Sequence, residues 1–243
     1  MSGTELAWVA LAIALASFAQ SLSGFGFALL SVPLMTLVVS PRDAVIISTI
    51  IGATSTSIQS VLDRRHLDWA LARRLSIASY VGMPFGLGAF LLVSETGLRL
   101  ALGVVVLVAT FLLLRGFRLH DEQHHYDWSL GVLAGILSTS TSTNGPPLVF
   151  LMQARQLAPS TFRATINTVF ALSNIGALAL FFGAGKVTTE NLTGVAVALP
   201  SLGISLALGY MARKHVSPER FRKLVIALLL LSSISVIASA LTR

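Results

Sequence analysis

The chain has 243 residues, of which 54% are hydrophobic and 11% charged; its mean hydropathy is +0.81 and its formal net charge is +7. A soluble domain usually carries about 25% charged residues, so this composition indicates a protein built for a lipid environment. The basic residues lie in short segments between apolar runs, which favours membrane topology over nucleic-acid binding as their role. The chain has no cysteine, which excludes disulfides, thiolate metal sites and cysteine nucleophiles.

Apolar runs of about 18 or more residues are long enough to cross a hydrocarbon core about 30 Å thick. Two regions, Leu6–Val39 and Trp128–Leu157, are too long for one simple span, and small and polar residues break each of them in the middle. No basic residue precedes Leu6, so we expect the first apolar segment to be retained rather than cleaved as a signal peptide. Ordinary spans are predicted over Ala44–Leu62, Leu75–Val93, Leu98–Leu114, Ala164–Gly185, Leu192–Ala212 and Leu224–Leu241.

The two halves of the chain resemble each other. Ser40-Pro41-Arg42 has a counterpart in Ala158-Pro159-Ser160, and Met83-Pro84-Phe85-Gly86 has one in Leu199-Pro200-Ser201-Leu202. The identities are few, and chance similarity between hydrophobic sequences is the alternative explanation. The pattern predicts a first transmembrane repeat over 1–118, a linker over 119–127 and a second repeat over 128–243, each with a broken helix pair followed by three transmembrane helices.

Loop charge tests how the two repeats are oriented. If each broken region crossed the membrane once, the basic loops near Arg64 and Arg213 would lie on opposite sides, against the positive-inside rule. If each region enters and returns as two short helices, most of the 17 basic residues share one side. This predicts an all-α polytopic protein with inverted repeats and both termini outside the cytoplasm. Whether the short helices stop halfway or slant across the bilayer stays open. The residues expected on the cytoplasmic side are Arg64, Arg65, Arg73, Arg74, Arg115, Arg118, Arg155, Arg163, Arg213, Lys214, Arg220, Arg222 and Lys223, and those on the other side are Arg42, Arg99, Lys186 and Arg243.

The two breaks are the candidate binding site. Non-helical backbone at membrane depth persists only where it is buried in protein or lines a wet cavity, so we expect the breaks to face each other. A new helix follows each break, and each helix start carries about half an elementary positive charge, which suits a small anion bound near the midplane. Close packing by small residues is the alternative role. The predicted substrate-binding residues are Ser23, Gly24, Phe25, Gly26 and Phe27 in the first break and Ser142, Thr143, Asn144, Gly145 and Pro146 in the second.

The acids and histidines all fall in loops or at the ends of spans. An intramembrane enzyme, a metal site and a pump with a buried acidic proton relay are therefore disfavoured, and we expect no cofactor. Four more polar residues, one at the start of the first break and three within spans, are candidates to line the cavity, and for the two asparagines hydrogen bonding between helices is the alternative role. They are Gln20, Tyr80, Asn167 and Asn174.

Short motifs in both halves are similar to those of a known family. They are Ser23-Gly24-Phe25-Gly26-Phe27 followed by Val32-Pro33, and Asn144-Gly145-Pro146-Pro147 after the segment 131–135. On these motifs the chain resembles the TauE/SafE sulfite exporter family, also called TSUP, over essentially its whole length. The resemblance implies transport of sulfite, thiosulfate or an organosulfonate across a bacterial inner membrane. Many members have a glycine-rich element in each broken helix, whereas the second break here is rich in serine and threonine.

The leading hypothesis is thus a membrane transporter of a small sulfur-containing anion. The competing hypothesis is a non-transporting scaffold or anchor subunit, although a scaffold has no need of two polar breaks at membrane depth. An intramembrane enzyme is a distant third. The expected partners are the anionic substrate and the lipid bilayer, without nucleic acid, and the sequence leaves a homo-oligomer open.

Overall fold

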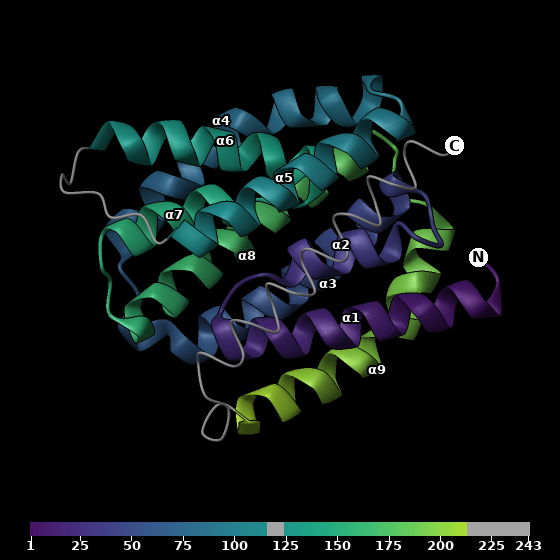
Figure 1. Cartoon of the computed structure of the whole chain (residues 1–243), viewed down its shortest axis with the longest axis horizontal. Coiled ribbons are helices and arrows are strands. Elements are labelled where there is room, and N and C mark those ends of the chain that lie inside the picture. The colour runs from purple at the N-terminus through teal and green to yellow at the C-terminus, as the bar shows by residue number, and fades with distance from the viewer. Residues whose placement is uncertain (116–123, 213–243) are drawn as a thin grey trace.

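A computed structural model describes residues 1–115 and 124–212, and in this part of the chain every regular element is helical (Figure 1). The prediction of an all-α membrane protein is confirmed in this respect. The helices are α1 (Gly3–Ser23), α2 (Phe27–Met35), α3 (Pro41–Asp63), the 3-10 helix η1 (Arg64–His66), α4 (Trp69–Leu92), α5 (Glu95–Arg115), α6 (His124–Thr141), α7 (Gly145–Ala154), α8 (Pro159–Gly183) and α9 (Thr189–Ala212).

Local sequence explains where several helices begin. Ser2 and Glu5 form a capping box at the start of α1. Ser40 caps α3, its hydroxyl accepts a hydrogen bond from the Asp43 N–H, and Pro41 occupies the first turn, where its missing N–H is harmless. The Asp68 carboxylate caps α4 in the same way through the Leu71 N–H. These caps satisfy backbone donors that would otherwise be left unpaired at the helix ends.

Five helices in the described part of the chain are long and apolar enough to cross a membrane. Four of them, α3, α4, α8 and α9, match spans predicted from the sequence, whereas the span over Leu224–Leu241 lies outside the described residues. The fifth is α1, with 21 residues, and α6 has 18. The expectation of two short helices in each broken region is wrong, because each pair combines a long helix with a short one, α2 of 9 residues and α7 of 10.

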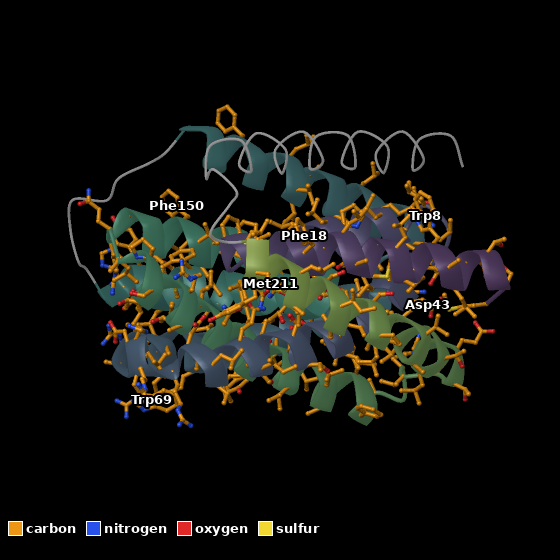
Figure 2. All side chains as sticks on the ribbon, turned by 90° about the horizontal axis from the view of Figure 1, so that it is seen from below. Trp8, Phe18, Asp43, Trp69, Phe150 and Met211 are labelled. Atoms are coloured by element: carbon orange, nitrogen blue, oxygen red, sulfur yellow. The ribbon has the colours of Figure 1, made fainter. Side chains whose placement is uncertain are left out.

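Each broken pair returns to the end of the molecule at which it begins. The Trp8 indole near the start of α1 donates to the Leu34 carbonyl near the end of α2, at 2.7 Å. Arg155, just after α7, lies 2.6 Å from the Asp127 carboxylate near the start of α6. In Figure 2, Trp8 and Asp43 lie toward one end of the bundle, and Trp69 and Phe150 lie toward the opposite end. The two pairs therefore enter the bundle from opposite ends.

Three long helix pairs form the bundle. Helices α1 and α9 run parallel, because the N-terminal amine lies 3.5 Å from the Glu190 carboxylate while Gly209 packs against Ser21 at the other end. Helices α4 and α6 also run parallel, and a Cβ at Gly135 would lie 1.9 Å from the Ser79 carbonyl oxygen, so only glycine permits this approach. The central pair, α3 and α8, is antiparallel, since Ser60 bonds to Thr168 while Gly52, earlier in α3, packs against Asn174, later in α8.

The charged residues gather at the two ends of the bundle. We call one the N-terminal end; it carries Arg42, whose guanidinium donates to the Phe90 and Val93 carbonyls, and Arg99, which donates to the Thr36 carbonyl. We call the other the arginine-rich end, formed by η1 and the neighbouring starts of α4, α6 and α8, where Arg74 and Arg155 flank the buried Asp127 carboxylate. Large apolar side chains on the outer faces of the helices, such as Phe85 and Ile204, are exposed, as a lipid-facing surface requires.

Candidate functional site

The first break reverses the chain within three residues. Helix α1 ends at Ser23, and Gly24 follows with a φ of 86°, its N–H donating to the Gln20 carbonyl at 2.7 Å. Gly26 has a φ of 95° and precedes α2. Both angles lie in the left-handed region that residues with a Cβ rarely adopt, so the glycines make this tight reversal accessible to the backbone.

No side chain caps the start of α2. The Leu30 N–H bonds to the Gly26 carbonyl, and the N–H groups of Phe27, Ala28 and Leu29 before it have no acceptor among the described residues. The first turn of α2 therefore offers three backbone donors and the positive end of a helix dipole.

The second break has a different construction. Helix α6 ends at Thr141, and Ser142 adopts a φ of 58° although it is not glycine. Its hydroxyl lies 3.1 Å from that of Thr49 on α3, which fixes the break against the first half of the chain. The hydroxyls of Thr141 and Thr143 lie 2.6 Å apart. The backbone itself closes α6, because the Ser142 N–H bonds to the Ser138 carbonyl and the Thr143 N–H to the Leu137 carbonyl, while the hydroxyls link the break to α3 and to each other.

The two breaks meet in one buried cavity. About 30 Å³ of it is open to the centre of a water molecule, which corresponds to roughly two water molecules. Helices α3 and α8 complete its walls, and none of the described residues that line it is charged. The lining residues are Gln20, Gly26, Phe27, Ala28, Leu29, Ser48, Gly52, Thr56, Ser142, Thr143, Asn144, Gly145, Phe170 and Asn174.

Asn144 is the most informative side chain in this cavity. It is 7% exposed, and its Nδ2 amide is buried without a hydrogen-bond partner. An unpaired buried donor costs about 1 to 3 kcal/mol, so such groups normally have a partner, which is a protein group, a water molecule or a ligand. Together with the three free N–H groups of α2, Asn144 makes the cavity rich in donors.

Several of the predicted site residues line one cavity. The cavity brings together Gln20, Gly26, Phe27, Ser142, Thr143, Asn144, Gly145 and Asn174.

Other predicted residues lie elsewhere. The Phe25 ring packs edge-on against Phe162, with the centroids 6.2 Å apart, and Pro146 faces an apolar groove between α5, α6 and α7. Gly24 lies beside Arg163, outside the cavity lining. The side chain of Ser23 lies outside what the structure describes.

Two of the four candidate lining residues, Tyr80 and Asn167, are not among the residues that line this cavity. The Tyr80 hydroxyl donates to the Leu172 carbonyl at 3.0 Å, so this residue links α4 to α8. The Asn167 amide donates to the Arg163 carbonyl of its own helix at 2.9 Å and does not line the cavity.

The sequence interpretation missed the wall formed by α3. Ser48, Gly52 and Thr56 line the cavity at intervals of four residues, and Phe170 does so from α8. Residues four apart share one helix face, so this stripe of small and polar side chains was a signal for the lining.

The helices and the cavity together define a multi-pass α-helical membrane protein with a polar cavity at two helix interruptions, which is the plan of many transporters. The chain belongs to the sulfite exporter TauE/SafE family, which it matches over residues 9–236. The family is one of transporters. No solved structure matches the chain.

A curated relative is similar to part of the chain. It is a protein of Comamonas testosteroni named "Probable inner membrane transporter protein TsaS", 31% identical over 104 residues. The match covers 42% of this chain and 44% of the relative, so the chain matches less than half of that protein.

Proposed function

We propose that the protein carries a small sulfur-containing anion, such as sulfite or thiosulfate, across the bacterial inner membrane and binds it in the cavity between the two breaks. The observation that carries this proposal is the buried, unpaired Asn144 amide, which lines the same cavity as Phe27, Ala28 and Leu29, the residues whose N–H groups begin α2. Four donors without acceptors around an uncharged polar cavity call for an acceptor-rich ligand.

The chemistry of these donors favours an anion over a neutral ligand. A hydrogen bond to a charged group contributes about 1.5 to 3 kcal/mol, more than a bond between neutral groups. The start of α2 adds about half a positive charge. None of the described residues that line the cavity is positively charged, so the electrostatic attraction between the cavity and the anion is moderate. A moderate attraction allows the anion to be released.

The size of the cavity narrows the class of substrate. About 30 Å³ of the cavity is open to the centre of a water molecule, and this space suits an ion of a few atoms better than a long organic chain. Sulfite and thiosulfate are therefore favoured over an organosulfonate as substrates.

The packing of the helices supports an inverted repeat. If α1, α2, α3 and α4 correspond to α6, α7, α8 and α9, the parallel pair α1–α9 corresponds to the parallel pair α6–α4, and α3–α8 corresponds to itself. The corresponding helices α1 and α6 begin at opposite ends of the bundle. By the positive-inside rule the arginine-rich end faces the cytoplasm, which places the N-terminus outside it.

Flux measurements in proteoliposomes test the proposal. The wild-type protein should take up radiolabelled sulfite with saturation, and Asn144→Leu should lose this uptake while folded yield is kept. Thr54→Val is the matched control, because Thr54 is exposed on α3 and its hydroxyl bonds to the Ile50 carbonyl of its own helix. Normal flux in Asn144→Leu would remove the site.

The same assay separates the alternative of a non-transporting scaffold. A scaffold would show no saturable flux of sulfite, thiosulfate or an organosulfonate, and a protein would co-purify with it. We favour transport because the family is one of transporters and the cavity holds unpaired buried donors.

A further inference from the structure

Helix α8 presents a line of residues that leads from the cavity toward the arginine-rich end. Asn174 and Phe170 line the cavity, and Asn167 and Arg163 follow on the same side of the helix at intervals of three and four residues. With a rise of 1.5 Å per residue, Arg163 begins about 10 Å along the helix from Phe170. A polar helix face therefore continues beyond the cavity.

Helix α3 supplies the opposite wall. Ser48, Gly52 and Thr56 line the cavity, and Ser60 continues the four-residue spacing toward the arginine-rich end. The Ser60 hydroxyl lies 2.7 Å from that of Thr168 on α8. The seam between α3 and α8 is thus polar from the cavity to the first residues of α8.

The opposite direction is apolar. Ile47, Ile51, Phe90 and Phe181 are fully buried in one hydrophobic cluster with Ile13. This cluster joins α1, α3, α4 and α8 on the side of the cavity nearer the N-terminal end. In this structure the polar route from the cavity therefore leads toward the arginine-rich end.

Arg163 lies at the far end of this polar helix face, and part of its guanidinium group has no hydrogen-bond partner. Its Nε is buried without a partner, and no carboxylate among the described residues lies within ion-pair distance of it. Arg74 and Arg155 at the same end both pair with Asp127. The Arg163 side chain also lies against the first break, since a Cβ at Gly24 would be 2.6 Å from its Cγ.

We propose that Arg163 is a second anion-binding station, through which the substrate passes between the cavity and the arginine-rich end along the α3–α8 seam. This inference rests on the proposed function and adds a residue that determines anion affinity on one side of the membrane. A guanidinium suits this role because its planar donors match the oxygens of an oxyanion. A purely structural Arg163 would instead complement the negative end of the α1 dipole and affect stability alone.

Transport kinetics measured separately from the two sides test the station. Because the chain has no cysteine, a single Lys186→Cys label at the N-terminal end reports the orientation of the protein in proteoliposomes. KM for sulfite is then measured on each side. In Arg163→Gln it should rise about tenfold or more on the arginine-rich side, as expected for loss of a charge-assisted hydrogen bond, and stay within about twofold on the other.

Two further variants keep the result interpretable. Arg163→Lys retains the charge and should raise the same KM less than Arg163→Gln does, and it serves if the glutamine variant fails to fold. Arg73→Gln removes an exposed charge at the same end and should leave both KM values unchanged.

The outcomes separate this station from the proposed function. Wild-type flux with an unchanged KM in Arg163→Gln, or an equal rise on both sides, would overturn the station alone. An equal rise in KM in Arg73→Gln would show that Arg163 acts only through general surface charge, which would also overturn the station. Absence of saturable flux in the wild-type protein would overturn the proposed function and the station together.

Discussion

Each of the two breaks ends one helix and begins the next, but the two breaks do so with different residues. The first uses glycines at positive φ and leaves three N–H groups of α2 unpaired. The second uses Ser142 at positive φ and is followed by Pro146 and Pro147, which have no N–H to donate. The first break thus contributes backbone donors, and the second contributes the side chain of Asn144. The proposed site between the two breaks is chemically asymmetric in consequence.

This asymmetry determines which changes test each break. Backbone donors are removed only by displacing the helix start, which a substitution of Gly26 does through strain. A side-chain donor is removed by a direct exchange, as at Asn144. Each break can therefore be tested by a substitution that leaves the other break unchanged.

The largest effect is expected for Asn144→Asp. The exchange keeps the size of the side chain, removes its amide donors and adds a negative charge facing the anion. A like charge in a buried site and the lost hydrogen bond together should lower the initial rate of sulfite uptake about 100-fold or more. Uptake at the normal rate with normal folded yield would contradict the role of the second break.

The next effect concerns the two glycines of the first break. At Gly24 a Cβ would meet the Arg163 side chain at 2.6 Å in addition to backbone strain, whereas at Gly26 it would meet nothing within 4 Å. Gly26→Ala should lower the free energy of unfolding by about 1 to 2 kcal/mol, from strain alone. Gly24→Ala should be more destabilising, as measured by thermal unfolding in detergent.

Asparagine provides the control for the first break. Because asparagine tolerates the left-handed region better than β-branched residues do, Gly26→Asn should retain more uptake and stability than Gly26→Val. Equal behaviour of the two variants would show that the φ of Gly26 does not hold the start of α2 in place.

A smaller effect is expected from exchanges of Ser142. Ser142→Ala loses the contact with Thr49 but keeps the strained φ, whereas Ser142→Gly loses the same contact and relieves the strain. The glycine variant should therefore be more stable than the alanine variant by about 1 kcal/mol. The opposite order in thermal unfolding would mean that the backbone at this position is not left-handed.

The smallest effect is expected at Pro146. Pro146→Ala adds one N–H to the first turn of α7 and makes the second break more like the first. If added donors strengthen anion binding, the dissociation constant for sulfite should fall about two- to fivefold, the usual range for an interaction with a helix start. Weaker binding with unchanged stability would contradict the account of the asymmetry.

Much of this architecture could be predicted because lipid imposes strict rules on sequence. Length and hydropathy placed α3, α4, α8 and α9, and unsatisfied backbone at membrane depth required the two breaks to be buried. Both breaks do line one cavity. These predictions depend on properties of single segments.

The residues whose place relative to the cavity was not predicted are those that depend on packing between segments. Packing decides which helix faces touch. Tyr80 and Asn167 are polar residues within spans, but the first bonds to a neighbouring helix and the second to its own. The α3 wall of Ser48, Gly52 and Thr56 was not predicted, although the three residues share one helix face. Sequence shows which residues share a face but not which partner covers it.

Equilibrium binding tests the central claim most directly, namely that donors from both breaks surround one anion. Binding of radiolabelled sulfite to the purified protein is compared with binding to Asn144→Leu, with Thr54→Val as control. We predict saturable binding to the wild type and the control, and affinity at least about tenfold lower in Asn144→Leu, from the loss of one hydrogen bond to a charged group. Equal sulfite affinity in all three folded proteins would contradict the account.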